Sequence, residues 1–201
     1  MTLTSGICRG CKDNAGGIKK VYIADEALVD WTKFEQAPAP TDDTDPVEKT
    51  ITNIELVTGA SWYVFQVNKY SSSWTETINV ADTGNVSYQQ VVSLVFSKNS
   101  QDKRNVISEI AKGDLVMIIE DNNGKKWLIG SEDNGVALSG GTSTSGTAMG
   151  DMNGWSPEFT CNSVSPANEI AANATAGTAD SEDVLLQDLL DLADEGCTPS
   201  I

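Results

Sequence analysis

The pattern of apolar and polar positions along the chain is mostly that of β-strands. Residues 115–119 form an apolar run, too short for a helix and rich in β-branched side chains, so we expect a buried strand there. The tetrapeptide Asp121-Asn122-Asn123-Gly124 follows as a turn, because Gly accepts a positive φ, and residues 126–129 return as the partner strand. We expect the core to form around this hairpin.

Alternating or compact apolar segments predict further strands on both sides of the hairpin. Residues 61–70 carry bulky side chains on both faces, which is typical of a strand that is covered on both sides. Residues 155–164 are expected to be the last core strand. The full set of predicted flanking strands is 18–24, 50–57, 61–70, 74–80, 86–97, 136–138 and 155–164.

Helical spacing occurs in one place within the strand-rich region. In residues 101–112 the side chains of Val106, Ile107, Ile110 and Ala111 form one stripe, and Gly113 ends the segment. We expect this helix to cover the core rather than to form a partner groove. A short helical turn is expected within 25–34, and residues 139–150 form a Gly/Ser/Thr tract.

These elements predict a mainly β protein, an antiparallel β-sandwich or barrel with one flanking α-helix. The domain spans residues 18–165 and is preceded by an N-terminal arm at 1–17. Residues 166–201 are assigned to an acidic C-terminal extension with a helix at 181–194, where apolar positions share one face.

Loop 37–49 is the sharpest break in composition. Prolines remove backbone donors and favour extended conformations, and aspartates keep the segment hydrated. The loop is either an ordinary solvent loop or an arm that contacts a neighbouring subunit. In the second case, replacing its three aspartates together should weaken stacking. The candidate inter-subunit contacts are Pro38, Pro40, Asp42, Asp43, Asp45 and Pro46.

Charge and the lack of histidine narrow the function. The chain has 29 acidic and 13 basic residues, a net charge of −16, which argues against a protein that grips nucleic acid. The acidity is explained first by solubility, and it also permits a surface past which a polyanion slides. Without histidine, Ser-His-Asp and Cys-His sites are impossible within this chain, and no phosphate-binding or EF-hand motif is present. We therefore expect no enzyme, no cofactor and no metal.

The four cysteines leave two alternatives. Cys8 and Cys11 form a C-x-x-C that is either half of a zinc site or a redox pair, whereas Cys161 and Cys197 are isolated. A second C-x-x-C and a βαβ pattern are missing, which favours ordinary thiols or a disulfide formed in air. No run of eighteen apolar residues and no secretory signal is visible. We therefore expect no membrane association, and a protein that is made and used in a cytoplasm or is released without the secretory pathway.

Three stretches carry a resemblance to a known family. These are residues 13–24 (DNAGGIKKVYIA), residues 118–130, and residues 146–155 (GTAMGDMNGW) with the strand that follows. Their pattern and order resemble structural proteins in tailed phages of Bacteroidetes-type bacteria, specifically tail-tube subunits. The resemblance covers residues from about 8 to 165 and includes no active-site motif.

The resemblance implies a virion protein, assembled in the host cytoplasm, whose hexameric rings stack into a hollow tube. Its partners would be copies of itself, the tape measure and terminator proteins, and a sheath if the tail contracts. DNA would pass an acidic lumen without specific binding during genome ejection. Two alternatives stay open: a capsid decoration or head–tail connector protein, and a carbohydrate-binding β-sandwich module, which the five tryptophans suggest.

Overall fold

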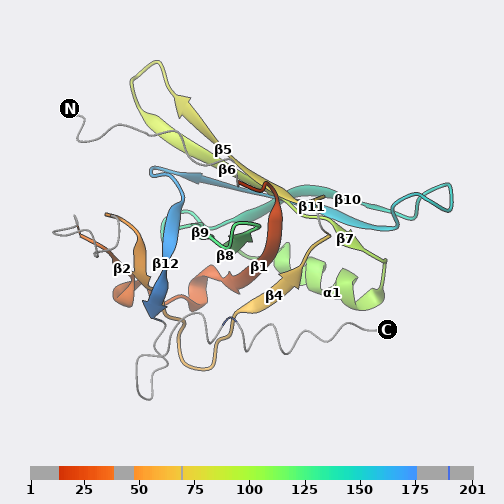
Figure 1. Cartoon of the computed structure of the whole chain (residues 1–201), viewed down its shortest axis with the longest axis horizontal. Helices are drawn as coiled ribbons and strands as arrows, with labels where there is room; N and C mark the ends of the chain where they lie inside the picture. The colour runs from red at the N-terminus through yellow and green to blue at the C-terminus, as the bar shows by residue number, and fades with distance from the viewer. Residues whose placement is uncertain (1–13, 39–47, 69, 176–189, 191–201) are drawn as a thin grey trace.

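The fold is two β-sheets packed face to face with one α-helix beside them (Figure 1). It is seen in a computed structural model that describes residues 14–38, 48–68, 70–175 and 190. The mainly β fold with antiparallel sheets and one helix is thereby confirmed. The barrel alternative is wrong, because the strands form two separate open sheets.

The larger sheet has seven strands in the order β2-β3-β12-β9-β8-β1-β4. Its neighbours pair antiparallel except β12 and β3, which are parallel. The expected central hairpin is β8 and β9, and Gly124 in its turn has a φ of 80°. The strands are β1 (Ile18–Asp25), β2 (Glu35–Gln36), β3 (Ile51–Asn53), β4 (Tyr63–Gln66), β8 (Leu115–Asp121), β9 (Lys126–Ile129) and β12 (Asn168–Thr175).

The smaller, five-stranded sheet follows the order β10-β11-β6-β5, and β7 also pairs with β11. All its pairs are antiparallel. The predicted long strand 86–97 is interrupted at Leu94 and Val95, so it forms two strands, β6 and β7. The strands are β5 (Ser73–Val80), β6 (Val86–Ser93), β7 (Phe96–Ser97), β10 (Ala137–Thr144) and β11 (Gly154–Ser163).

The larger sheet is buried on both faces, which explains the continuous apolar run of β8. Met117 and Ile119 point into a core shared with Val92 and Phe159 of the five-stranded sheet. Side chains that alternate with these, including Ile118, form a second core on the other face. That second core also contains Tyr22, Ile54, Trp62 and Leu190.

Helix α1 (Gln101–Ile110) confirms the predicted helix, and the Ser100 hydroxyl caps its start by accepting from the Lys103 N–H. The expected role of its apolar stripe is only partly right. Ile107 and Ile110 are half-buried, but Val106 is 40% exposed and no residue of α1 is fully buried. The helical turn expected at 25–34 is two short 3-10 helices, Glu26–Leu28 and Trp31–Lys33.

Two segments for which no strand was predicted contribute strands. The Gly/Ser/Thr tract supplies most of β10, because β11 offers backbone partners to residues 140–144 of the tract, after an irregularity between Leu138 and Gly140. Residues 168–175, assigned above to the C-terminal extension, form β12 between β9 and β3, with Ile170 and Ala174 buried. The domain therefore continues past residue 165, and β11 is not its last strand.

Most of the predicted arms lie outside the described residues. This holds for 1–13 of the N-terminal arm, for 39–47 of the proline-rich loop, and for the predicted helix 181–194 except Leu190, which is helical. Residues 14–17 are held against the β8–β9 turn: the Asn122 side chain donates to the Gly16 carbonyl at 2.7 Å, and Asn123 bonds to Ala15.

Candidate self-assembly surface of the five-stranded sheet

The five-stranded sheet has two long edges without a partner strand among the described residues. Strand β5 pairs with β6 alone and β10 pairs with β11 alone, and each edge strand is eight residues long. A long unpaired edge exposes backbone donors and acceptors that can join another chain. The larger sheet differs, since its outermost strands β2 and β4 have only two and four residues.

The outward face of this sheet is almost uncharged. Cross-strand register places alternate residues of the four strands on one side, away from the core. Glu158 is the one charged side chain in that set. The other members are Ser, Thr, Asn, Gln and Gly residues with one Val and one Ala: Ser73, Thr75, Thr77, Asn79, Ser87, Gln89, Val91, Ser93, Ala137, Gly140, Thr142, Thr144, Gly154, Ser156, Thr160 and Asn162.

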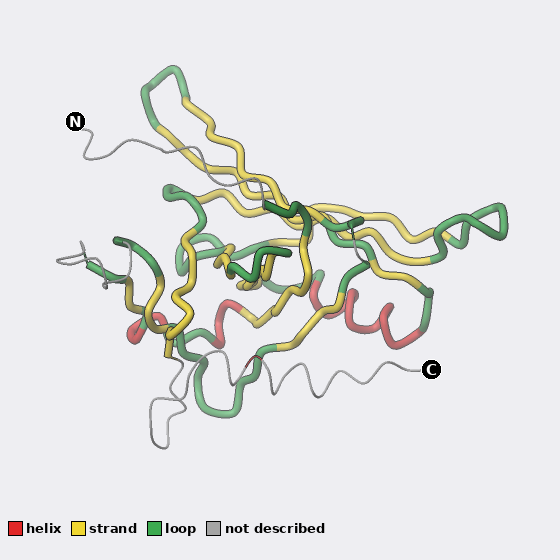
Figure 2. The backbone as a smooth tube through the Cα atoms, in the orientation of Figure 1, coloured by secondary structure: helices red, strands yellow, loops and turns green. Residues whose placement is uncertain are grey.

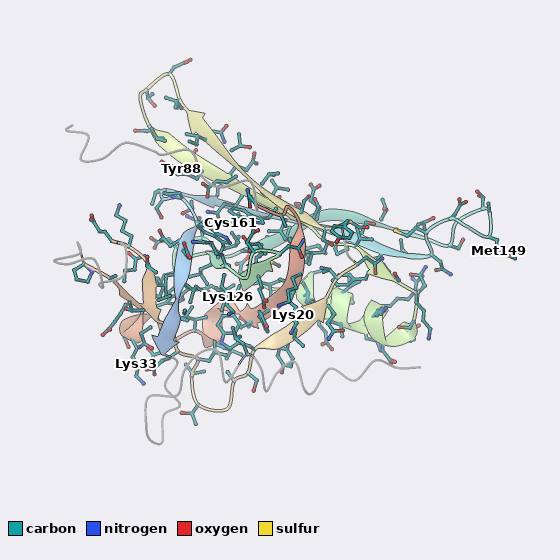
Figure 3. The ribbon with its side chains drawn as sticks, in the orientation of Figure 1. Lys20, Lys33, Tyr88, Lys126, Met149 and Cys161 are labelled. Carbon is teal, nitrogen blue, oxygen red and sulfur yellow. The ribbon has the colours of Figure 1, made fainter. Side chains whose placement is uncertain are left out.

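The inward face of β5 and β6 continues beyond the body of the protein. The cross-strand pair Trp74 and Val92 packs on the core between the sheets. Further along, the hairpin projects past the larger sheet, as the upper left of Figure 1 shows. There the inward face is exposed: Ile78 is 61%, Val80 68% and Val86 44% exposed. We call Ile78, Val80, Val86 and Tyr88 the apolar overhang; Tyr88, labelled in Figure 3, is half-buried.

Loop 145–153 between β10 and β11 projects at the other end of the molecule (Figure 2). Asp151 shapes it, because its Oδ2 accepts from the Ala148 N–H at 2.7 Å and from the Thr147 N–H at 2.8 Å. These hydrogen bonds to the Ala148 and Thr147 N–H groups and to the Thr147 hydroxyl hold the pKa of Asp151 below its ordinary value. The loop presents Met149, which is fully exposed and is labelled at the loop in Figure 3.

The proline-rich loop starts and ends at a defined base. Ala37 is buried, donates its N–H to the Thr50 carbonyl at 2.8 Å and accepts from the Lys49 N–H at 2.9 Å. Of the candidate contacts, Pro38 is exposed beside this base. Pro40, Asp42, Asp43, Asp45 and Pro46 lie outside the described residues, so their role stays a prediction.

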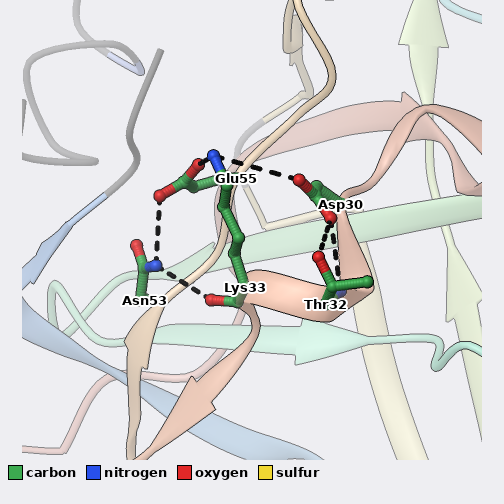
Figure 4. Close-up of polar contacts among 5 residues, drawn as sticks. All are labelled: Asp30, Thr32, Lys33, Asn53 and Glu55. Carbon is green, nitrogen blue, oxygen red and sulfur yellow. Dashed lines mark hydrogen bonds and ion pairs between the residues drawn. The ribbon is translucent and has the colours of Figure 1, made fainter. Parts of the chain in front are cut away.

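A polar cluster supports the chain leading into that loop (Figure 4). Lys33 Nζ lies 2.6 Å from Glu55 Oε2 and 3.9 Å from Asp30 Oδ2. Asn53 Nδ2 donates to the Lys33 carbonyl at 2.9 Å and to Glu55 Oε1 at 3.3 Å. The hydrogen bond to Glu55 raises the pKa of Lys33. Every charge of the cluster has a partner, which is typical of a structural role.

The described residues hold no grouping of three or more acidic or cysteine side chains suited to a metal ion. Cys161 is buried, its thiol donates to the Asn134 carbonyl at 3.2 Å, and burial raises its pKa to about 11. Such a thiol is a poor nucleophile at neutral pH. Cys8, Cys11 and Cys197 lie outside the described residues.

Most tryptophans are engaged in packing. Trp62 is buried, the rings of Trp74 and Trp127 lie 5.9 Å apart, and Arg104 lies over Trp155 at 5.3 Å. Trp31 lines a cleft of about 260 Å³ at the edge between the sheets, beside Phe34, Gln36, Gln90, Glu132 and Asn168. This cleft is one candidate position for a small ligand in the carbohydrate-binding alternative.

Sequence reasoning identified the alternation of β5 and β6 but missed the overhang. The alternation of apolar and polar residues indicates which side chains share a face of a strand. It does not indicate how far the opposite sheet extends over that face. The one signal was the placement of apolar residues at the last alternating positions on both sides of the turn at 82–85.

The class that the fold defines is a two-sheet β-sandwich with one helix. Comparison with protein-family models, with curated proteins and with solved structures found no match for this chain. No helix in the described part of the chain has the length and apolar character to cross a membrane.

Proposed function

We propose that this protein is a structural subunit that assembles with copies of itself into rings, the rings stacking as the tube of a phage tail. The edges of the five-stranded sheet would join neighbouring copies within a ring. The tube would be part of a virion, would meet the other tail proteins at its ends, and would conduct DNA during ejection.

The directions of the edge strands carry this proposal. Along β10-β11-β6-β5 every neighbour is antiparallel, so β10 and β5 run in opposite directions. A rotation about an axis along the strands preserves strand direction. Strand β5 of one copy therefore meets β10 of the next in an antiparallel arrangement, and the sheet continues around the ring without a reversal.

The thickness of the protein decides which side of such a ring faces inward. One side of the five-stranded sheet carries the larger sheet and the second core, whereas on the other side the described residues form no further layer. A closed ring has less room inside than outside, so the uncovered face would line the bore. That face offers no cation to phosphates and one carboxylate, Glu158, per copy. DNA would then pass a hydroxyl- and amide-rich, sparsely negative surface.

Strand spacing gives the size of the ring. Four strands from each of six copies, about 4.8 Å apart, give a circumference of about 115 Å and a backbone diameter of about 37 Å before strand tilt. Tilted strands widen this value.

Negative-stain microscopy of the purified protein, with native mass spectrometry, tests the proposal. We expect rings of one copy number and stacks of them. Discrete trimers would favour capsid decoration, and single rings that never stack would favour a connector. A stable monomer that binds a sugar array at the Trp31 cleft would favour the carbohydrate-binding module and overturn the proposal.

Adjacent proline substitutions in β10 test the edges themselves. Neighbouring residues of a strand direct their N–H groups to opposite sides, so of Thr142→Pro and Ser143→Pro one removes a donor from the free edge and the other a donor to β11. The free-edge variant should keep the unfolding midpoint of the monomer within a few degrees and form no rings. If both variants form rings as the wild type does, edge pairing is wrong.

A further inference from the structure

We propose that the apolar overhang of one copy docks on the Met149 loop of a second copy, in the next ring of the stack. This inference rests on the proposed function and names the surfaces that join one ring to another. These surfaces differ from the proline-rich loop 37–49, which the sequence suggested as the contact with a neighbouring subunit.

The overhang is one contiguous patch on the core side of the hairpin, and the polar pair Glu76 and Gln90 separates it from the core pair Trp74 and Val92. Ile78 pairs across the strands with Tyr88, and Val80 with Val86, so the four side chains form two consecutive pairs on one face. The other face of the same hairpin is wholly polar, with Thr77, Asn79, Ser87 and Gln89. Single exposed apolar residues are ordinary, but a contiguous patch on one face of a strand pair marks a contact site.

The register of the sheet places the overhang and the Met149 loop at opposite ends. Ser73, Ser93, Glu158 and Gly140 are register partners and form one row across the sheet. From this row β5 runs about 23 Å in one direction to Val80, at about 3.3 Å per residue. In the other direction β10 runs to Thr144 and continues into loop 145–153. Figure 3 shows Met149 far from the β5–β6 hairpin.

A ring generated by rotation therefore has two different ends. All overhangs lie on one end and all Met149 loops on the other, so neither can meet the other within the same ring. A second ring added by translation along the axis brings the two together. Such a head-to-tail contact does not close on itself and therefore produces a filament.

The two surfaces match in chemistry and in charge. Met149 is a flexible apolar side chain that adapts to an irregular patch, and Met152 beside it is 37% exposed. The loop is held in shape by Asp151 and, at its base, by Asn99, whose Nδ2 donates to the Thr144 carbonyl at 2.9 Å. In a chain with a net charge of −16, loop 145–153 carries one charged residue and the overhang carries none.

The test is assembly of the triple variant Ile78→Thr, Val80→Thr and Val86→Thr. Threonine keeps the β-branched shape that favours strands while removing the apolar patch. We expect single rings in place of stacks, with at least a tenfold rise in the protein concentration at which stacks first form. The matched control changes the opposite face, Thr77→Ser with Asn79→Ser, and should stack as the wild type does.

The variant Met149→Ser tests the other half of the contact without altering the hairpin, and should give the same rings without stacks. Circular dichroism and the unfolding midpoint of each variant establish that it is folded. If either overhang or loop variant stacks at the wild-type concentration, this inference is wrong while rings and tube remain. If the wild type forms no rings at all, the proposed function fails first.

Discussion

Replacing Ile118 with alanine tests whether the second core is a true core. Ile118 is 0% exposed on the face of the larger sheet that turns away from the five-stranded sheet. The substitution removes about three carbon groups, worth about 2.4 kcal/mol of transfer free energy at about 0.8 kcal/mol each. The cavity left behind adds about 1 kcal/mol, so we expect the free energy of unfolding to fall by about 3 to 4 kcal/mol.

Urea denaturation followed by tryptophan fluorescence, below the concentration at which rings form, measures this loss. Met117→Ala, one residue away on the opposite face of β8, should cost a similar 2 to 5 kcal/mol, since Met117 is also 0% exposed. Ile78→Ala on the exposed overhang should cost no more than about 0.5 kcal/mol. A loss below about 1 kcal/mol for Ile118→Ala, beside a full loss for Met117→Ala, would refute burial of the sheet on both faces.

Three further predictions concern local features of the fold. Gly154→Ala should lower the unfolding midpoint strongly, because a Cβ there would lie 2.0 Å from the Phe96 carbonyl oxygen, whereas Gly150→Ala, with nothing within 4 Å, should have little effect. Cys161 should resist alkylation at pH 8 in the folded protein. Because its folded pKa of about 11 exceeds the ordinary 9.0, the contribution of the neutral thiol to stability is present below pH 9 and is lost as pH rises toward 11. The pKa of Asp151 is shifted the other way, below its ordinary 3.8, so its carboxylate keeps its hydrogen bonds in the loop at pH values somewhat below 3.8. These hydrogen bonds should be lost only when pH falls through the lowered pKa, and amide chemical shifts of the loop would report the loss.

The elements predicted best from the sequence are those whose local chemistry and burial agree. The β8–β9 hairpin combines an apolar run with a turn that needs Gly124, and α1 combines helical spacing with the capping residue Ser100. Each of these signals lies within a few residues, so tertiary contacts did not have to be known.

The segments missed are those that depend on a distant partner. β12 is rich in Ala and Asn, which have low strand propensity, and becomes a strand because β9 and β3 bond to it from both sides. β10 consists largely of Gly, Ser and Thr and depends in the same way on β11. The overhang could not be located either, since its exposure reflects where the opposite sheet ends.

The pairing of charges within one copy bears on how copies associate. Lys125 pairs with Glu169 at 2.7 Å, Lys33 with Glu55 at 2.6 Å, and Lys19 pairs with Glu120. Because these cations are already paired within the chain and the net charge is −16, copies repel one another at long range. The proposed contacts are backbone edges and apolar side chains, which gain nothing from unlike charges.

Salt should therefore strengthen assembly. At about 0.15 M ionic strength the Debye length is about 8 Å and at about 1 M it is about 3 Å, so added sodium chloride screens the repulsion and leaves apolar contacts intact. We expect rings and stacks to form at lower protein concentration as salt rises over this range, as light scattering and microscopy would show. Assembly held by ion pairs between copies would instead weaken with salt, and that result would contradict both proposed interfaces.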